Sequence, residues 1–372
     1  MPNPINLTLS RDALLPVLAR AASVIEARST IPILSNLLMS VEHGALRLIG
    51  TDLDISIETS VDAETHGLEG RITAPGGLLH DIVKKLPEGA RINLAHQDSQ
   101  IIVKSGRSRF TLSTLPAEDF PEVPEPEASH RFTLPRKTLE ALLSRVNFAA
   151  STEEVRYYLN GVFWHVLDGK LISVATDGHR LARFAVAAPE GAEGMPSIII
   201  PRDTVAEMLK LLKGEREETV GIEISLTQAR FEIGRTRLAS KLIDGTFPEY
   251  QRVIPQRNDR VAEARREDIL RAADRVSTIS SERGRAVKLR FTEGALQLSV
   301  TNPDAGSSSD EVEIEFSGNE IEMGFNARYL ADALGAIEGD IAKISLADAG
   351  SPALITSAAE DAFLTVLMPM RV

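Results

Sequence analysis

Three neighbouring polar residues, Asp177, His179 and Arg180, are of types that could support acid–base chemistry. A carboxylate can orient an imidazole, and the imidazole can exchange a proton near neutral pH. A hydrolytic centre would also require a nucleophile or a metal ion beside them, and neither is in view around these positions. The chain contains no cysteine, so thiolate nucleophiles, thiolate zinc sites and disulfides are excluded.

A second candidate is the carboxylate pair Asp52 and Asp54, which could bind a divalent cation. No third ligand falls near this pair, and the seven histidines show no metal-ligand spacing. Turn or solvated carboxylates are therefore the favoured interpretation, and we expect no metal. The sequence also has no glycine-rich loop of the Walker type, so we expect no nucleotide cofactor and no ATP use by this chain.

The elements that would position these residues recur three times along the chain. Similar segments surround three glycines that lie 125 residues apart, namely Gly44, Gly169 and Gly294. A strand follows each segment and ends, again at a spacing of 125, in Thr51-Asp52, Thr176-Asp177 or Thr301-Asn302. A third set with the same spacing is Gly89, Gly214 and Gly339, each after an apolar helical stretch. Three independent markers at one period predict three copies of one unit.

The repeat changes the interpretation of the acidic residue in the first candidate centre. Asp52 and Asn302 occupy the position of Asp177 in the other two copies. Asp177 is therefore expected to be a strand-end turn residue, and Asp177-Gly178 is a favourable hairpin turn. Only His179 and Arg180 remain as residues that one copy has and its sister copies lack, so an enzyme is carried only as an alternative.

Each unit shows the order strand, helix, several alternating strands, a second helix and further strands. Helices segregated to one side of largely antiparallel sheets make an α+β unit, so we expect two helices per unit and six per chain. The proline-rich residues 121–126 indicate a linker. We place the three units at residues 1–127, 128–254 and 255–372.

The 372 residues have the composition of a soluble multidomain protein, with 43% hydrophobic and 25% charged residues and a net charge of −12. The charge is unevenly distributed. The expected helices hold 18 Lys and Arg against 11 Asp and Glu, so they carry +7 and the remaining chain carries −19; the helices are residues 10–28, 75–86, 135–149, 201–213, 265–285 and 325–337. A surface lined by these helices could face phosphates. The simpler interpretation is that Lys and Arg favour helices and flank their apolar faces.

The N-terminus shows no basic segment leading into an apolar one, and no apolar run is long enough to span a bilayer. Together with the absence of cysteine, this composition suits a reducing compartment. A cytoplasmic protein is therefore expected.

Several segments together resemble one family, the bacterial DNA sliding clamp, which is the β subunit of DNA polymerase III. The most specific are residues 156–161 (RYYLNG), 175–182 (ATDGHRLA) and 247–250 (FPEY), with 30–34 (TIPIL) and 368–372 (MPMRV) in addition. The resemblance covers the whole chain. It implies three copies of the clamp fold and a head-to-tail homodimer that closes into a ring around duplex DNA, with helices inside and sheets outside. It also implies a non-catalytic processivity factor that slides on DNA without reading its sequence.

The resemblance further implies a pocket, between the second and third units, for short peptides of the polymerase III alpha subunit, the clamp loader, other polymerases and repair proteins. Apolar and methionine side chains suit a groove that accepts many partners. The pocket residues implied are Leu159, Thr176, Gly178, His179, Arg180, Leu181, Pro248, Arg252, Val253, Asn326, Tyr329, Val366, Leu367, Met368, Pro369, Met370 and Arg371. Within this set, Arg180, Arg252 and Asn326 could hydrogen-bond the peptide. The simpler interpretation is that residues 367–370 form a final core strand.

DNA contacts are carried over by resemblance to Arg28, Tyr157 and Tyr158. Arginine would supply charge to phosphate, and tyrosines can stack on or hydrogen-bond to exposed strand ends. Since adjacent residues point in different directions, one of the two tyrosines is expected to pack in the core. This chain has Gly77 and Glu153 where the family has polar or basic DNA-facing residues, so no contact is carried over to those positions.

For the ring interface, the alternating strand of residues 107–111 carries Arg107 and Arg109, and the third unit has an acidic strand with Glu311 and Glu313. Pairing these edges between chains would cancel charge and cover exposed strand edges. Arginines 235 and 237 of the second unit allow the alternative that such arginines are ordinary repeat features. Ile279 is a further interface residue by resemblance, and Gly284 stands where the family often has an aromatic residue. A monomeric peptide-binding hub that never encircles DNA is the alternative function.

Overall fold

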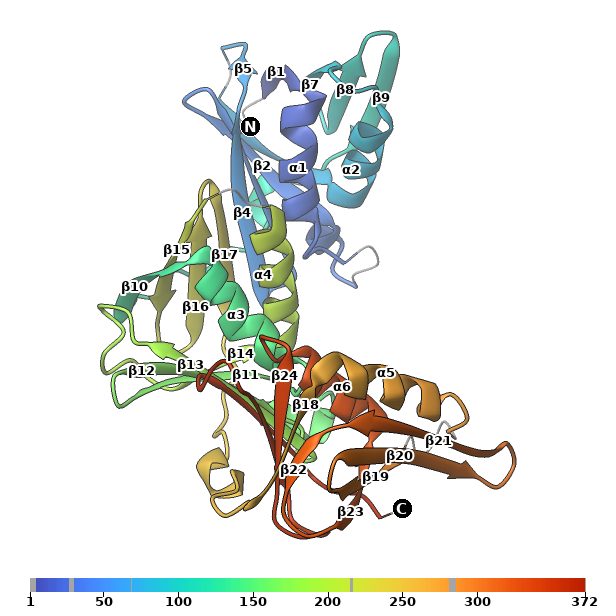
Figure 1. Ribbon diagram of the computed structural model, residues 1–372. Coiled ribbons are helices and arrows are strands. Elements are labelled where there is room, and N and C mark those ends of the chain that lie inside the picture. Colours follow the sequence, from blue (N-terminus) through green and yellow to red (C-terminus); the bar gives the residue numbers. More distant parts are fainter. Residues whose placement is uncertain (1–4, 27–29, 68, 215–216, 281–285, 372) are drawn as a thin grey trace. The chain divides into compact units, whose positions relative to one another are not determined.

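The computed structural model describes residues 5–26, 30–67, 69–214, 217–280 and 286–371 (Figure 1). Its α-helices are α1 (Arg11–Ala22), α2 (Gly76–Lys85), α3 (Arg136–Asn147), α4 (Arg202–Gly214), α5 (Arg266–Ser277) and α6 (Ala327–Gly335). The short 3-10 helices are η1 (Pro32–Ser35), η2 (Ala117–Asp119), η3 (Glu154–Leu159) and η4 (Tyr250–Val253).

The strands alternate with these helices in the order expected for three repeats. Those of the first repeat are β1 (Asn6–Ser10), β2 (Asn36–Glu42), β3 (Ala45–Thr51), β4 (Ile55–Asp62), β5 (Glu64–Thr65), β6 (Gly70–Pro75), β7 (Arg91–Gln97), β8 (Gln100–Ser105) and β9 (Ser108–Ser113). Those of the second are β10 (His130–Pro135), β11 (Gly161–Leu167), β12 (Lys170–Thr176), β13 (Arg180–Ala187), β14 (Ile198–Pro201), β15 (Thr219–Ile224), β16 (Gln228–Ile233) and β17 (Thr236–Lys241). Those of the third are β18 (Arg260–Arg265), β19 (Ala286–Thr292), β20 (Ala295–Asn302), β21 (Gly306–Glu313), β22 (Glu315–Ser317), β23 (Ile321–Asn326), β24 (Ile341–Leu346), β25 (Ala353–Ser357) and β26 (Phe363–Leu367).

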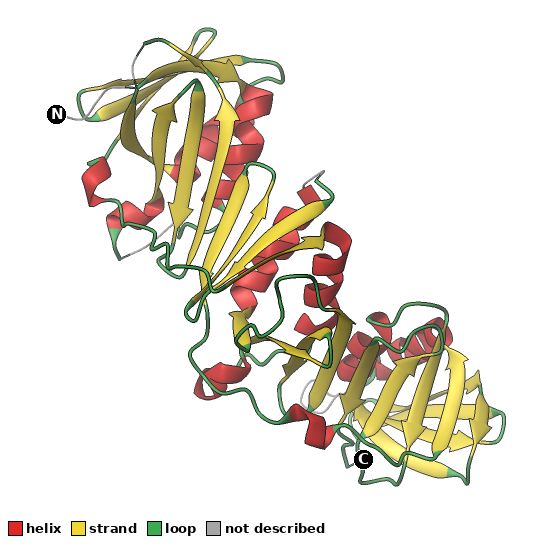
Figure 2. Ribbon diagram, turned by 90° about the vertical axis from the view of Figure 1, so that its left-hand side faces the viewer, coloured by secondary structure: helices red, strands yellow, loops and turns green. Residues whose placement is uncertain are grey.

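The chain forms two compact units rather than one body per repeat. The first comprises Met1–Arg136 and Ala206–Leu242, and the second comprises Lys137–Val205 and Ile243–Val372. The first unit holds the sheets β5-β1-β7-β8-β9 and β10-β15-β16-β17-β4-β3-β2-β6, and the second holds β14-β11-β12-β13-β26-β25-β24-β18-β22 and β21-β20-β19-β23. Neighbouring strands run antiparallel, and α1 packs beside α2 as α5 packs beside α6 (Figure 2). The predicted α+β class is confirmed.

The glycines that revealed the repeat lie in three equivalent hairpin turns. Gly44, Gly169 and Gly294 have φ angles of 78°, 70° and 77°, between the strand pairs β2–β3, β11–β12 and β19–β20. Tight hairpins of this kind require positive φ, which glycine adopts without steric penalty. The 125-residue period therefore records a backbone requirement.

In both units, strands from successive repeats pair with each other. We call the β4–β17 ladder the first joint and the β13–β26 ladder the second joint. In the first joint Arg237 lies opposite Glu58, and in the second Leu364 lies opposite Arg183. Because Glu58 and Arg183 are 125 positions apart, the two joints have the same register.

Two helix ends differ from the sequence-based expectation by more than two residues. Helix α1 ends at Ala22, where the N–H and hydroxyl of Ser23 both donate to the carbonyl of Arg20. Helix α5 ends at Ser277, and the next hydroxyl, that of Thr278, donates to the carbonyl of Asp274. Serine and threonine hydroxyls compete for helix carbonyls in this way. The predictions of helix to residues 28 and 285 were therefore too long.

The first helix of each repeat begins with an arginine that binds a carbonyl in the last turn of the second helix or, in the third repeat, in the segment just after it. The guanidinium donates to a backbone carbonyl in each case: Arg11 to Lys84 (3.2 Å), Arg136 to Leu212 (3.1 Å) and Arg266 to Gly339 (2.8 Å). Such cations at a helix C-terminus satisfy carbonyls that have no partner within the helix. Over the observed bounds the helices hold 14 basic and 9 acidic residues, and these three arginines are structural.

One hydrophobic cluster in the second unit underlies the predicted pocket. It joins strands β11–β13 and β26 to the segment that contains η4, and its buried members are Leu159, Ile172, Val174, Leu181, Ala185, Ile199, Phe247, Tyr250 and Val366. Burial of this many apolar side chains fixes the strand ends on which the exposed pocket residues lie.

Candidate functional site

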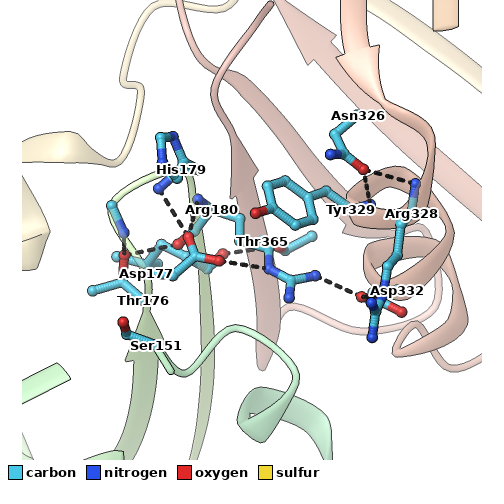
Figure 3. Close-up of polar contacts among 12 residues, drawn as sticks. Ser151, Thr176, Asp177, His179, Arg180, Asn326, Arg328, Tyr329, Asp332 and Thr365 are labelled. Carbon is cyan, nitrogen blue, oxygen red and sulfur yellow. Dashed lines mark hydrogen bonds and ion pairs between the residues drawn. The ribbon is translucent and has the colours of Figure 1, made fainter. Parts of the chain in front are cut away.

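The turn at Asp177 is held by its own side chain (Figure 3). One carboxylate oxygen accepts the backbone N–H groups of His179 (2.9 Å) and Arg180 (3.0 Å). The carboxylates and amides at the equivalent positions act alike, since Asp52 accepts from Asp54 and Ile55, and Asn302 accepts from Asp304. The prediction that Asp177 is a strand-end turn residue is confirmed.

Arg180 is committed to contacts within the second unit. Its guanidinium donates to Asp177 (3.1 Å) and to Asp332 of α6 (2.6 Å), and only 9% of the side chain is exposed. The guanidinium carbon also lies 4.1 Å from the ring centre of Tyr329, which is a favourable cation–π distance. Arg180 therefore fastens the turn of the second repeat to a helix of the third, as Figure 3 shows.

Asn326 begins the helix that receives this contact. Its side-chain oxygen accepts the N–H groups of Arg328 (3.0 Å) and Tyr329 (3.2 Å), a standard N-cap arrangement. The cap sets the start of α6 and so the position of the Tyr329 ring beside Arg180 (Figure 3). Both residues serve to shape the site, and a hydrogen bond from Asn326 to a peptide stays a prediction.

The C-terminal residues divide into a buried strand and an exposed end. Val366 and Leu367 belong to β26 and are buried, so the core-strand interpretation of residues 367–370 is right for Leu367. Met368 and Met370 are 44% and 38% exposed. Their backbone is nevertheless held in place, because the N–H of Met368 donates to the carbonyl of His179 and the N–H of Met370 donates to the carbonyl of Gly324. Large apolar side chains held at the surface by backbone hydrogen bonds are typical of interaction sites.

A buried polar pair that the sequence reasoning missed supports η4. The Nε2 of His165 lies 2.9 Å from the hydroxyl of Tyr250, and both side chains are buried. Burial and the nearby Arg183 lower the pKa of His165, and burial raises the pKa of Tyr250. Tyr250 begins η4, which ends at the half-exposed Val253, so this pair anchors one wall of the predicted pocket. The FPEY motif contained the tyrosine, but nothing local pointed to a histidine 85 residues earlier.

All predicted pocket residues lie in the second unit. Those that are buried are Leu159, Thr176, Leu181, Val366 and Leu367; those that are half-buried are Arg180, Asn326, Tyr329 and Pro369; those that are exposed are Gly178, His179, Pro248, Arg252, Val253, Met368, Met370 and Arg371. The exposed members combine apolar side chains with cationic ones. Such a surface suits peptides with apolar anchors, and peptide binding by these residues stays a prediction.

The predicted DNA-contact residues are only partly described. Arg28 lies outside the described residues. Tyr157 is exposed, whereas Tyr158 is half-buried against the hydrophobic cluster and against Gly245, where a Cβ atom would lie 2.9 Å from it. The expectation that one tyrosine packs in the core is confirmed for Tyr158. Their rings meet edge to face at 5.8 Å, which leaves Tyr157 as the outward one.

The structure also describes Glu153 and Gly77, the two positions where this chain departs from the family's polar or basic DNA-facing residues. Glu153 forms an ion pair with Arg156 (2.6 Å), and this contact lowers the pKa of the carboxyl. Gly77 lies in the first turn of α2 with open space around its Cα. Neither position supplies a positive charge.

The predicted ring-interface residues lie at two sheet edges. Strand β9 is an edge of one sheet and β21 an edge of another. Arg109 lies on β9, but Arg107 lies in the turn before it, so the prediction of a strand from residue 107 was one residue too long. Within the part of the chain that the structure describes, Arg107, Arg109, Glu311 and Glu313 are exposed and form no ion pair; Ile279 is half-buried.

The metal and membrane alternatives find no support among the described residues. No group of three His, Asp or Glu side chains there could hold a metal ion. Asp54 forms an ion pair with Lys241 (3.0 Å) instead. No helix within the same residues is long and apolar enough to cross a membrane.

Comparison with known families matches the chain in three consecutive parts. Residues 5–124 match the DNA polymerase III beta subunit, N-terminal domain; residues 133–249 match its central domain; and residues 251–371 match its C-terminal domain. The beta sliding clamp of Caulobacter vibrioides (strain NA1000 / CB15N) is 44% identical over 98% of this chain and 100% of that protein. The beta sliding clamp of Escherichia coli (strain K12) is 37% identical over 98% of this chain and 99% of that protein.

Solved structures agree with these relatives. A DnaN sliding clamp (DNA polymerase III subunit beta) from Bartonella birtlesii, bound to griselimycin, has a TM-score of 0.97 and 46% identity, and the match covers 99% of this chain and 100% of that one. A C. crescentus beta sliding clamp, with PEG bound to its putative beta-motif tethering region, has a TM-score of 0.97 and 44% identity, with all of both chains covered.

Proposed function

The chain belongs to the family of DNA polymerase III beta subunits, the sliding clamps that act as polymerase processivity factors, and we propose that two copies close head to tail around duplex DNA. We place its three repeats at residues 1–127, 128–254 and 255–372. The linker at residues 121–126 precedes the first boundary, and η4 ends just before the second.

The observation that carries the proposal is the identity of the two joints. The chain joins its repeats twice through the same ladder, and within the part that the structure describes the outer edges of β9 and β21 pair with no strand. Strand β9 is the equivalent of β17 and β26, and strand β21 is the equivalent of β4 and β13. A third joint formed with a second copy would pair β9 with β21 of the partner, and two such contacts would close the assembly.

The register of the proposed contact follows from the joints inside the chain. Arg237 opposite Glu58 corresponds to Arg109 opposite Ser309 of the partner subunit. Two residues before Arg109, Arg107 lies opposite Glu311 of the partner subunit. Glu313 of the partner subunit is then diagonal to Arg107. Opposite charges at such positions contribute about 0.2–1 kcal/mol per pair, and pairing also covers two exposed strand edges.

An arginine at the same position in the first helix of each repeat supports the assignment of β21 to a third joint. Arg20, Arg145 and Arg275 occupy the tenth position of α1, α3 and α5. Arg20 donates to Thr236 of the first joint (3.2 Å), and Arg145 stacks on Phe184 and Phe363, which face each other in the second. Arg275 donates to Asp310 of β21 (2.5 Å), at the same ladder position. The third repeat is therefore arranged like the other two, although no strand among the described residues pairs with the outer edge of β21.

Binding of DNA would depend on charge rather than on base recognition. Exposed lysines lie on helices of the first two repeats, among them Lys84, Lys85, Lys137, Lys210 and Lys213. Contacts from such side chains to phosphates are sequence-independent and allow sliding. An encircled duplex can leave the ring only at its ends, so weak contacts suffice for retention.

The second joint would tether the proteins that work on the DNA. Met368, Met370 and Val253 supply apolar contact area beside the cationic Arg252 and Arg371, and the contacts of Arg180 hold the turn of the second repeat to α6. We infer a cytoplasmic, non-catalytic subunit that binds short peptides of the polymerase III alpha subunit, the clamp loader, and other polymerases and repair proteins.

The interface is tested by charge reversal and rescue. The double variant Arg107→Glu/Arg109→Glu is expected to weaken dimerisation by about a hundredfold or more, measured by sedimentation equilibrium. The matched control is Arg235→Glu, which alters an exposed ion pair inside the chain and should leave the dimer unchanged. Mixing the double variant with Glu311→Arg/Glu313→Arg should restore association, and an unchanged dimer constant for the double variant would refute the assignment.

Peptide binding by the C-terminal residues is tested separately. Deletion of residues 368–372 should abolish binding of a peptide from the clamp-binding segment of the DNA polymerase III alpha subunit, measured by fluorescence anisotropy. Sedimentation should show the dimer intact. Normal peptide affinity after the deletion would remove the C-terminal residues from the site.

A further inference from the structure

The first joint carries a cavity of its own. A volume of about 510 Å³ lies between the ends of β4 and β17 and the linker of residues 121–126. Its apolar walls come from Leu53, Ile55, Val123, Ala239 and Leu242. All of these residues belong to the first unit, so the cavity lies within one compact body.

This cavity occupies the position that the predicted peptide pocket has in the second unit. Adding 125 to five residues of its wall, Thr51, Leu53, Asp54, Ile55 and Ser56, gives Thr176, Gly178, His179, Arg180 and Leu181. The ladder registers likewise relate Ala239 and Lys241 of the wall to Val366 and Met368. The linker supplies a further match, since Phe120-Pro121-Glu122 resembles Phe247-Pro248-Glu249. The cavity therefore lies at the place in the first joint where the peptide pocket is predicted in the second.

The edge of the cavity holds a strained and exposed leucine. Leu53 has a φ of 81°, in the left-handed region where the equivalent residue, Gly178, has 87°. A leucine is disfavoured in this conformation, whereas glycine is not. The side chain of Leu53 is 44% exposed, and Leu226, in the turn that contributes Thr227 to the wall, is 81% exposed. A strained backbone that presents an apolar side chain to solvent is a feature of binding sites.

Two equivalent positions are acidic around the cavity and basic around the predicted pocket, whereas a third is acidic in both, since Glu122 corresponds to Glu249. Glu249 forms an ion pair with Arg252. Asp54 stands where the second joint has His179, and Glu125 stands where it has Arg252. Asp54 pairs with Lys241 (3.0 Å) and Glu125 with Arg237 (3.1 Å). Glu122 also lines the cavity, and within the described residues it forms no ion pair. The rim therefore has an uncompensated negative charge, which favours a cationic ligand.

We propose that the first joint is a second peptide-binding site, and that it takes a segment of a partner protein with an apolar side chain flanked by lysine or arginine. The apolar side chain enters the cavity beside Leu53 and Ile55, and the flanking cation lies near Glu122. This site goes beyond the proposed function. The clamp would then hold two classes of partner, separated by the charge of the segments that they present.

The test uses two fluorescein-labelled probes, the basic peptide KKLFK and the acidic peptide EELFE, with the full-length protein in anisotropy titrations. Wild type is expected to bind KKLFK at least about tenfold more tightly than EELFE at low salt. Leu53→Gly relieves the strained backbone, so the protein should be no less stable, yet its affinity for KKLFK should fall at least about fivefold. Glu122→Lys should reduce the preference for KKLFK over EELFE.

Two controls separate this proposal from the function proposed above. Val155→Ser removes another exposed apolar side chain, one that belongs neither to the cavity nor to the predicted pocket, and should leave KKLFK binding unchanged. Deletion of residues 368–372 should also leave KKLFK binding unchanged while it abolishes binding of the alpha-subunit peptide. Equal affinity of wild type for the two probes, or a Leu53→Gly variant that binds KKLFK normally, would overturn the proposal. Loss of KKLFK binding upon the deletion would also overturn it, because the probe would then be bound at the second joint.

Discussion

The first and second joints use one ladder register but hold different side chains at it. At one position of the ladder, Thr59 faces Thr236 in the first joint, and Phe184 faces Phe363 in the second. The threonine hydroxyls hydrogen-bond to each other, and Arg20 donates to one of them. The two phenylalanines instead enclose an arginine from α3. The backbone thus fixes the geometry of a joint, while the paired side chains decide how strongly it is held and what its surface can bind.

The largest expected difference between the joints concerns stability. Arg145 is 7% exposed, lies about 4.5 Å from both phenylalanine rings, and donates to Glu360 and to the carbonyl of Ala336. Arg145→Ala should destabilise the second unit by about 3–5 kcal/mol, because Glu360 would lose its buried partner. Arg20→Ala, the matched change in the first joint, should cost less, because the hydroxyls of Thr59 and Thr236 still hydrogen-bond to each other without the arginine. Urea unfolding followed by circular dichroism measures both, and equal losses would contradict the distinction.

The second expected difference concerns ligand affinity. In the second joint, the guanidinium of Arg180 bonds Asp332 of α6. The first joint has no such contact at the equivalent position, because the residue there is Ile55. Asp332→Asn should lower the affinity for the alpha-subunit peptide about tenfold, equal to about 1.4 kcal/mol, through displacement of Arg180 and Tyr329. Binding of KKLFK should not change. An unaltered affinity for the alpha-subunit peptide, measured by anisotropy, would show that the ion pair has no part in shaping the site.

A smaller difference should appear on acidification. Burial and the nearby Arg183 lower the pKa of His165, so the folded protein binds this proton less readily than the unfolded chain does. The stability that neutral His165 contributes is therefore complete above about pH 6.5 and is lost as the pH falls toward the folded pKa. The equivalent position in the first repeat is Ser40, which does not titrate.

Replacement of the histidine isolates this effect. His165→Gln should reduce the decrease in urea midpoint between pH 7.5 and pH 5.5. His96→Gln is the control for the first unit, where burial also lowers the pKa of a histidine. If the decrease is the same in wild type and His165→Gln, the buried His165–Tyr250 pair does not make the second unit acid-sensitive.

The smallest expected effect comes from making the rim of the first joint resemble that of the second. Lys241→Met introduces the residue type found at Met368 and removes an exposed ion pair with Asp54. Stability should stay within about 0.5 kcal/mol of wild type, because exposed ion pairs contribute little. Affinity for KKLFK should rise, since one positive charge leaves the rim. A decrease in affinity would mean that Lys241 contacts the probe favourably.

Local sequence signals sufficed for the repeated features. The hairpin glycines and the turn carboxylates at Asp52 and Asp177 are required by backbone conformation within a few residues, so their spacing shows in the sequence. The resemblance to sliding clamps predicts a binding surface at the C-terminal methionines, which the structure shows to be exposed. Neither kind of signal revealed that Arg145 is buried, because its partners, Ala336 and Glu360, lie about two hundred residues away.

Long-range packing also limits what the charge count of the expected helices can predict. It treated every helical Lys and Arg as available to phosphate, since composition does not show which face a residue occupies. Arg11, Arg136 and Arg266 bind carbonyls, and Arg145 and Arg275 bind carboxylates. Only long-range packing distinguishes these structural cations from the exposed lysines.

Small-angle X-ray scattering over a range of protein concentrations tests the central claim that a third joint, formed between copies, closes a ring. A closed ring of two copies should give a particle of twice the 40.4 kDa chain mass, with a pair-distance distribution that shows a hollow centre. The Arg107→Glu/Arg109→Glu variant should shift the mass toward that of one chain at low concentration. A compact or simply elongated 40.4 kDa particle at every concentration would contradict the ring and leave a monomeric peptide-binding hub as the function.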